Sequence, residues 1–554
     1  MKRLFLVGSI IYLSCVAGYG QTPQDRPRIW DILNYTIRIS FDAPKKVVYG
    51  DTTVTMTPLS SSLSLAELDA AGMQFKSVRE DGAATELKYR TSSSSVAVDL
   101  PRTVAPGDKI ALRFTYTITE PKKGVNFIAA STPNDPFKHP AQIWTQNEPE
   151  DARYWFPSFD FPSDKATSEE FITVRKGETA IGNGKLIESK PNANGTVTFH
   201  YRMDVPHSTY LTSFVVGTYI RLDDKYGRVP LGFYAFADKQ RQAKIAFLRT
   251  KEMMAAFESL TNVPFPFAKY DQIMVSGFEE IDGMENITST TLADNTILLA
   301  DFPFGRPLVE DLVSHELAHS WFGNLVTCRN WSELWLNESF ATFMEAVWRE
   351  KSIGRAAYLN KLIDDRREYF ADDAINKNHH ALQNKSAVGD NSLFDVTTYQ
   401  KGSLVIHMLR ESVGDVAFWN GINLYLTRHK FDTVISTDLQ SAMEEASGKK
   451  LRSFFDQWIF TAGYPRLEVR KSYDAENKEV RVTVSQVQKA DGKVLDAYSF
   501  PLEIEVTTEA GSSVHKVDIS KREETFNFPA SNIVTKVSID PLEKVILKSV
   551  KMIE

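Results

Sequence analysis

The spacing of apolar residues changes twice along this 554-residue chain, and this change restricts the folds it can adopt. From about residue 30 to residue 228, apolar and polar residues alternate, as in DILNYTIRISFD, where Leu33, Tyr35 and Ile37 fall on one face. A period of two is typical of half-buried strands, and Pro, Gly and Asp separate the alternating segments. An antiparallel β domain is therefore predicted for residues 21–228.

The apolar spacing lengthens to three and four residues between residues 229 and 463. LVEDLVSHELAHSWFG, ESFATFMEAVWREKSIG and QKGSLVIHMLRESVG show this spacing, which is that of one helical face. The alternation returns after GYPRLEV, for example in EVRVTVSQV. We therefore predict a multidomain α+β protein: the β domain, a mostly helical domain at 229–463 and a small β-sandwich at 464–554. The length of the chain, which exceeds that of a single core, fits several domains.

Composition excludes several classes of protein. Hydrophobic residues make up 42% of the chain and charged residues 24%, which is near the average for folded soluble proteins and unlike disordered ones. The formal net charge of −7 provides no basic face for nucleic acid and no polybasic patch for a membrane surface. A neutral or cationic small partner is expected instead, and the sequence carries no signal for an oligomeric state.

The first twenty residues, MKRLFLVGSIIYLSCVAGYG, predict a secretory signal peptide. Two basic residues precede an apolar run from Leu4 to Val16, and small residues follow it, so that cleavage is expected after Gly18 or Gly20. The run is shorter than the roughly 20 residues that span a bilayer, and no later segment is long and apolar enough to do so. We expect an exported protein, periplasmic or extracellular.

Cysteine usage agrees with stabilisation by a large core. The residues before Cys15 match a lipid-attachment pattern poorly, so a lipid anchor is not expected. Removal of the signal peptide leaves Cys328, and a single cysteine cannot form an internal disulfide.

The stretch VSHELAHSWFGN, residues 313–324, carries two histidines four residues apart. His315 and His319 would project from one helical face, with Cβ atoms about 5 to 6 Å apart, and could reach one ion. Zinc in catalytic sites takes three protein ligands and keeps a fourth position for water. Glu338 in WSELWLNESFATF, separated from His319 by eighteen residues, is the expected third ligand, and Asn337 is expected to cap its helix.

Glu316 follows the first histidine and points slightly round the helix, toward water at the metal rather than the metal itself. This is the position of a general base. The alternative is a core helix with hydrogen-bonded histidines. With ten histidines in the chain, a chance HExxH pattern is expected only about 0.01 times, so a site for one zinc ion per chain is favoured.

These motifs resemble those of the M1 gluzincin aminopeptidases. HELAHSWFGNLVT and WSELWLNESFATF are similar to the zinc signature of that family, DGMEN to its exopeptidase motif GxMEN, and TYQKG to the segment with its catalytic tyrosine. TQNEPEDARYWFPSFD and STYLTSFVVGTY resemble its N-terminal β domain, and QWIFTAGYPRLEV resembles its next domain junction. The resemblance runs from about residue 30 to residue 554 and implies a thermolysin-like catalytic domain.

The resemblance also implies roles at matching positions. Glu285 of DGMEN, together with Glu148 of TQNE, would bind the free α-amino group of a peptide. The remaining motif residues, Gly283, Met284 and Asn286, would complete the substrate-binding segment. Carboxylates would offset the desolvation of the buried ammonium.

The resemblance also implies a hydroxyl group beside the scissile carbonyl. The resemblance implies that Tyr399 stabilises the oxyanion on the scissile carbonyl. From helical spacing, Glu345 is either a partner of a ligand histidine or a plain exposed glutamate, and His407 is expected to pack rather than to bind metal.

Two departures from the family pattern change the expectations. Asp282 stands where the motif has its first glycine, and the segment from Phe278 to Met284 has one residue more than expected. The strand that aligns the substrate is therefore expected to differ. The large C-terminal helical domain of longer members is not matched, from which we expect a more open cleft.

The sequence thus predicts a zinc metallo-aminopeptidase that hydrolyses N-terminal residues from peptides. A zinc-activated water would attack the carbonyl, with Glu316 as general base and Tyr399 on the oxyanion. One alternative is a zinc endopeptidase or bifunctional hydrolase of the same fold, and another is a non-catalytic peptide-binding module.

Overall fold

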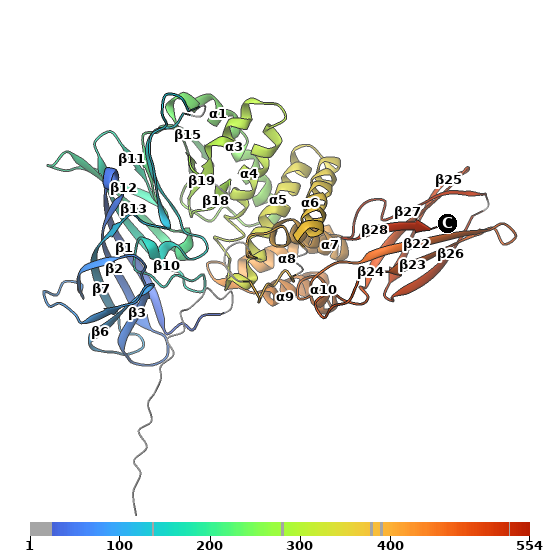
Figure 1. Cartoon of the computed structure of the whole chain (residues 1–554), viewed down its shortest axis with the longest axis horizontal. Coiled ribbons are helices and arrows are strands. Elements are labelled where there is room, and N and C mark those ends of the chain that lie inside the picture. The colour runs from blue at the N-terminus through green and yellow to red at the C-terminus, as the bar shows by residue number, and fades with distance from the viewer. Residues whose placement is uncertain are drawn as a thin grey trace, which may run out of the picture.

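The computed structural model describes residues 25–135, 138–278, 282–376, 380–387, 392–530 and 532–553. The predicted signal peptide therefore lies outside the described residues. Three regions follow one another along the molecule: blue and cyan strands, then green to orange helices around a smaller sheet, then red strands (Figure 1). The predicted order of a β domain, a mostly helical domain and a small β domain is confirmed.

Strands dominate the first region. Their bounds, with those of the short 3-10 helices between them, are β1 Trp30–Asp42, η1 Ala43–Lys45, β2 Val47–Pro58, β3 Leu63–Asp69, β4 Gln74–Glu80, β5 Tyr89–Thr91, β6 Ser95–Val104, β7 Ile110–Thr119, β8 Gly124–Ile128, β9 Gln142–Gln146, η2 Ala152–Tyr154, β10 Ala166–Arg175, β11 Thr179–Ile181, β12 Lys185–Pro191, β13 Thr196–His207, η3 Thr209–Leu211 and β14 Val215–Gly217. Within the described ranges they form sheets in the orders β12-β13-β10-β1-β2-β7-β4, β11-β14-β9-β8 and β3-β6-β5. Most neighbours are antiparallel, whereas β1 and β10 are parallel.

The first strand departs from strict alternation. A register shift in β1 between Ile32 and Asn34 leaves Ile32 buried, at 1% exposure, and Leu33 only half-buried. The prediction that Leu33 shares the inner face with Tyr35 is therefore wrong. A β-bulge reverses the facing of residues on one side of it, and alternation alone does not reveal its position.

The second region combines a sheet with helices. Its strands, helices and turns are β15 Ile220–Tyr226, β16 Val229–Ala235, η4 Ala237–Lys239, α1 Gln240–Ala246, α2 Thr250–Thr261, β17 Tyr270–Val275, β18 Gly283–Met284, β19 Ser289–Ala293, α3 Asp294–Leu298, η5 Leu299–Asp301, α4 Arg306–Ala318, β20 Thr327–Cys328, η6 Trp331–Glu333, α5 Trp335–Ser352, α6 Arg355–Asn376, the π-helical turn η8 Thr397–Lys401, α7 Gly402–Val413, α8 Asp415–Arg428, β21 Thr433–Val434, α9 Ser436–Ser447 and α10 Arg452–Trp458. The sheet order is β15-β16-β17-β19-β18, which leaves β18 at an edge.

The last region is a pair of small sheets. Their strands are β22 Arg466–Asp474, β23 Glu479–Gln486, β24 Phe500–Thr508, β25 Gly511–Ile519, β26 Glu523–Pro529, β27 Val534–Ile539 and β28 Lys548–Ile553. In the part of the chain that the structure describes, the sheet orders are β26-β23-β22-β28 and β25-β24-β27. Val480, Val482 and Val484 are buried, as their alternation predicts.

The predicted domain boundaries at 228 and 463 remain predictions. β15, which begins at Ile220, pairs with β16 in the sheet of the helical region. Among the described residues, no helix has both the length and the apolar character needed to cross a bilayer.

Candidate metal centre and cleft

Two helices bring three potential metal ligands together. His315 lies on α4, His319 ends that helix, and Glu338 lies in the first turn of α5. The Nε2 atoms of His315 and His319 lie 3.3 and 3.4 Å from Glu338 Oε2, and the two imidazole rings are 4.8 Å apart. The three ligand atoms all lie within 4.8 Å of one another. The spacing read from the sequence thus corresponds to one cluster in space.

This donor set fits a zinc ion. Ligands at about 2.0 to 2.1 Å in a tetrahedron stand about 3.4 Å apart, close to the observed separations from Glu338 Oε2. Both histidines use their other nitrogen elsewhere. His315 Nδ1 lies 2.8 Å from Glu345 Oε1, and His319 Nδ1 lies 2.9 Å from the Phe322 carbonyl oxygen. These contacts orient both Nε2 atoms toward the cluster.

Glu316 lies beside the cluster without joining it. The side chain is 5% exposed, and burial raises the pKa of its carboxyl to about 8 against the opposing effect of His315 and His319. Its Oε2 has no hydrogen-bond partner among the described residues. A Cβ added to Gly283 would lie 2.3 Å from Glu316 Oε1, so glycine allows β18 to approach this carboxylate closely.

A second group of carboxylates adjoins the candidate metal ligands. Oxygens of Glu148, Glu285 and Glu338 lie within 4.8 Å of one another. Burial raises the pKa of Glu148 and of Glu285, and the Glu285 charge raises that of Glu148 further. Within the described ranges, the Oε1 atoms of Glu148 and Glu285 are buried without a hydrogen-bond partner. Two buried carboxylate oxygens without donors form a site suited to a cation.

The DGMEN segment forms one wall of the cleft. Gly283 and Met284 make up β18, which pairs with β19 through Leu292 and Thr291. Asn286 donates from Nδ2 to Thr291 Oγ1 over 3.1 Å. An edge strand presents free backbone groups, so an extended peptide can be aligned there.

The polar contacts of this segment hold it in place. Asp282 Oδ1 accepts a hydrogen bond from the Thr296 hydroxyl at 2.8 Å. Asn324 Nδ2 donates to the Glu285 carbonyl oxygen over 2.9 Å. Asn324 is the last residue of the HELAHSWFGN stretch, which also carries the candidate ligands His315 and His319. Its hydrogen bond to Glu285 was not predicted from the sequence.

Tyr399 faces the cluster from a π-helical turn. Its ring is stacked on His315, with 6.0 Å between the ring centroids, and it lies in η8. Ser339 Oγ, next to Glu338, donates to the Thr398 carbonyl oxygen at 2.6 Å. A Cβ on Gly402 would lie 1.7 Å from Ser339 Oγ. The close packing of α7 on α5 therefore sets the position of Tyr399 relative to the metal ligands.

A cavity of about 940 Å³ contains these groups. Its lining includes all three candidate ligands, together with Glu148, Glu285, Glu316, Gly283, Met284 and Tyr399. Acidic side chains outnumber basic ones in the lining, where Lys361 is the basic residue among those described. The cavity thus favours a ligand that carries positive charge where it meets the carboxylates.

The structure tests the predictions made for three further residues. Asn337 is not the helix cap, because α5 begins at Trp335; its side chain accepts from Cys328 N and donates to the Tyr210 hydroxyl. Glu345 contacts His315 and is therefore not a plain exposed glutamate. His407 packs against Tyr358, with Nδ1 2.8 Å from the hydroxyl oxygen, away from the three ligands.

The supporting contact behind Glu345 could not be read from the sequence. Lys361 Nζ on α6 lies 3.0 Å from Glu345 Oε2 and also contacts Asp365. A charged side chain on an amphipathic helix usually faces solvent, and nothing in the local pattern distinguishes Lys361 from its neighbours.

Comparisons with known proteins agree across the three regions. Residues 245–458 match the model of the peptidase family M1 domain, and residues 32–211 match that of the peptidase M1 N-terminal domain. Residues 463–539 match a domain of unknown function, DUF3458, with an Ig-like fold.

Several curated proteins are similar to parts of the chain. Aminopeptidase N of Streptomyces lividans is 32% identical over 356 residues, which cover 62% of this chain and 40% of that protein. Puromycin-sensitive aminopeptidase of Caenorhabditis elegans is 27% identical over 507 residues, 88% of this chain and 52% of that protein. The chain thus spans about half or less of the length of these relatives.

A solved structure supports the fold. The crystal structure of Legionella pneumophila aminopeptidase A in complex with aspartic acid matches with a TM-score of 0.82 and 19% sequence identity. The match covers 96% of this chain and 61% of that one.

Proposed function

Because the chain belongs to peptidase family M1, we propose that it is a zinc-dependent aminopeptidase that removes residues from the free N-terminus of peptides. The observation that carries this proposal is the pair of buried carboxylate oxygens without donors, on Glu148 and Glu285, next to the metal-ligand cluster. The aminopeptidase names of the relatives support it.

His315, His319 and Glu338 would hold the zinc ion, which when bound would supply Lewis acidity and lower the pKa of a water molecule. Glu316 accepts the proton of the attacking water and passes it to the leaving amine. Its closeness to the ligands and its buried, partner-free Oε2 support this role. Glu345 holds His315 in the tautomer with Nε2 free.

Tyr399 stabilises the oxyanion that forms on the scissile carbonyl. Its ring stacks on His315 and lines the cavity, and the residue lies in the π-helical turn η8, which supports this role. A fixed donor directed at developing charge acts mainly in the transition state.

The two glutamates select for the substrate's N-terminus. An ammonium between Glu148 and Glu285 supplies the donors that their Oε1 atoms lack. Because Glu285 and Glu148 also adjoin Glu338, the ammonium lies close to the bond that is cut, which limits cleavage to the first residue. β18 aligns the peptide backbone along the cleft.

We also propose that the protein is exported. The support is the pattern of residues 1–20, with two basic residues before a short apolar run and small residues after it.

A digest of one peptide in free and N-acetylated forms tests the aminopeptidase proposal. Acetylation removes the charge, so two desolvated carboxylates would face a neutral amide. Leaving a buried charge unpaired costs about 2 to 5 kcal/mol, so cleavage should fall at least about 30-fold. Mass spectrometry should show a one-residue ladder from the free form only.

Two other outcomes would favour the alternatives. Internal cuts at equal rates in both forms would indicate an endopeptidase. Binding of the peptide without any cleavage by the zinc-loaded protein would indicate a peptide-binding module. Glu285→Ala should weaken cleavage of the free form in the same way as acetylation.

A further inference from the structure

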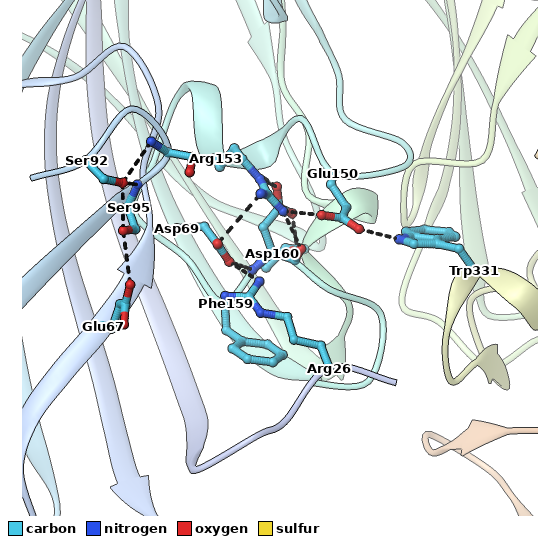
Figure 2. A network of polar contacts seen from close by, with 12 residues as sticks. Arg26, Glu67, Asp69, Ser92, Ser95, Glu150, Arg153, Phe159, Asp160 and Trp331 are labelled. Carbon is cyan, nitrogen blue, oxygen red and sulfur yellow. Dashed lines mark hydrogen bonds and ion pairs between the residues drawn. The ribbon is translucent and has the colours of Figure 1, made fainter. Parts of the chain in front are cut away.

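A buried network of charges lies where the N-terminal β domain meets the helical region (Figure 2). Arg153 in η2 lies at its centre. The guanidinium Nε is 3.0 Å from Asp160 Oδ2, Nη1 is 3.7 Å from Asp69 Oδ1, and Nη2 pairs with Glu150. Arg26 binds the other side of Asp69 at 2.6 Å. The fork of an arginine can hold several carboxylates in fixed directions.

One bond of this network crosses to the helical region. Trp331 Nε1 donates to Glu150 Oε1 over 3.0 Å, and Figure 2 shows the indole pointing at that carboxylate from the facing chain segment. Trp331 and Glu150 are 2% and 6% exposed. A buried indole N–H and a buried carboxylate oxygen thus satisfy each other across the boundary.

Each residue of this hydrogen bond lies close in the chain to a residue of the candidate site, Glu150 to Glu148 and Trp331 to Glu338. Glu150 stands two residues after Glu148, in a tight turn closed by the Asp151 N–H on the Asn147 carbonyl oxygen at 2.7 Å. Trp331 opens the helical turn that runs into α5, through the Leu334 N–H on the Trp331 carbonyl oxygen and the Glu338 N–H on the Leu334 carbonyl oxygen. Glu338 is a candidate metal ligand.

A second contact supports the first. The Tyr210 ring, from η3 of the β domain, packs edge-on against Trp331 with 5.4 Å between centroids. The Tyr210 hydroxyl accepts from Asn337 Nδ2 at 3.2 Å, one residue before Glu338. The start of α5 is thus held at two points by the β domain.

We propose that Glu150 and Trp331 are positioning residues that set the distance between the amine-binding Glu148 and the metal ligand Glu338. The inference rests on the proposed function, in which Glu148 binds the substrate's amino group. Glu148 comes from the β domain, whereas Glu285 and the candidate metal ligands come from the helical region. The spacing between ammonium and metal therefore depends on how the two regions dock. Misplacement by about 1 Å can cost about 100-fold in rate.

Two substitutions at Glu150 separate position from charge. Glu150→Asp keeps the charge opposite Arg153 but withdraws the carboxylate from Trp331 by about one carbon–carbon bond, about 1.5 Å. Glu150→Gln keeps an oxygen at full reach to accept from Trp331, but it removes the charge and replaces the oxygen that accepts from Arg153 with an amide N–H group. Trp331→Phe removes the donor and retains the ring contact with Tyr210.

The measurement is kcat/KM for a peptide with a free amine, divided by kcat/KM for its N-acetylated form, together with zinc content. Glu150→Asp and Trp331→Phe should lower this ratio at least about fivefold with zinc content unchanged, whereas Glu150→Gln should stay within about threefold of wild type. Trp348→Phe is the matched control, because it removes a comparable bond, from Trp348 Nε1 to Glu310 Oε2 at 3.0 Å, within the helical region. It should leave the ratio unchanged.

A merely structural role predicts another pattern. Trp331→Phe would then lower the melting temperature without changing the ratio, and Glu150→Gln would be as harmful as Glu150→Asp. Either result overturns the positioning role. A wild-type protein with no preference for the free amine overturns the proposed function and this inference together, whereas a wild-type preference that persists in both Glu150→Asp and Trp331→Phe overturns the inference alone.

Discussion

At the scale of single residues, the chemistry of the site depends on carboxylates that differ in their surroundings. Glu338 has two imidazole partners, Glu345 has His315 and Lys361, and the Oε2 of Glu316 has no hydrogen-bond partner among the described residues. A carboxylate held by fixed partners orients a ligand, whereas one without them can exchange a proton. The three glutamates therefore suit different roles in one cavity.

Glu316→Gln should retain zinc and lose turnover by several orders of magnitude. The amide keeps the size of the side chain but cannot accept the proton of the attacking water. Metal analysis of the purified variant beside a kcat measurement checks this. Glu338→Ala is the contrasting variant, which should lose zinc as well. A Glu316→Gln protein with near-wild-type kcat would contradict the role of general base.

The sequence was most informative about residues that share one helix face. Helical periodicity placed His315 and His319 on one face, and Glu338 was predicted beside them as the third ligand that a catalytic zinc site needs, on a second helix. Asn337 was misassigned as a cap because α5 begins two residues earlier, after the turn η6. The contact between Trp331 and Glu150 joins residues 181 positions apart, so no local pattern could predict it.

At the scale of elements, the cleft depends on the close approach of β18 to α4. The sequence predicts a strand at DGMEN but not the sheet that carries it, and the reason is visible in β17 and β19, whose residues are all buried. Strands buried on both faces read as continuous runs without alternation, so they resemble parts of a buried helix. Apart from the strand at DGMEN, the prediction for this region therefore named only the helices, whose apolar spacing is clear in the sequence.

Gly283→Ala should lower kcat at least about tenfold while the protein keeps its zinc. The added Cβ would lie 2.3 Å from Glu316 Oε1 and 2.7 Å from Glu316 Cδ, so either the carboxylate or the strand must move. A displacement of the general base by a fraction of an ångström to 1 Å costs rate without affecting the metal ligands. Zinc content and kcat measured together check this, and an unchanged kcat would show that β18 shifts freely.

At the scale of the whole molecule, two domains contribute to one site. Glu148 comes from the β domain and Glu285 from the helical region, and the charge network around Arg153 lies at their boundary. Active sites between domains couple stability to geometry, because the same contacts fix both. The pH dependence of stability should therefore reflect this network.

Burial raises the pKa of the Glu150 carboxyl from its ordinary value of 4.5 to about 7, although Arg153 opposes this rise. Asp160 and Asp69 add to the rise, and Arg26 opposes it. Between pH 4.5 and 7 the folded state keeps a proton that the unfolded state has lost, so the free energy of unfolding should fall as pH rises through this window.

Glu150→Gln cannot titrate, so its stability relative to wild type should increase from pH 4.5 to pH 7, by at most about 3 kcal/mol, and stay level above. Denaturant unfolding of both proteins at several pH values checks this. A difference between the two proteins that does not vary with pH would show that the Glu150 carboxyl titrates equally in both states.

Zinc should stabilise the helical region selectively. A ligand that binds only the folded state stabilises it by about 4 kcal/mol at a thousand times its Kd. Calorimetry should therefore show that a chelator lowers the melting temperature of the helical region and that added zinc restores it. Because β22 to β28 form sheets of their own, a separate transition of the last region should not respond. Glu338→Ala should abolish the response to zinc, whereas Glu316→Gln should preserve it because all three ligands remain. An equal response in Glu338→Ala would place the stabilising metal elsewhere in the chain.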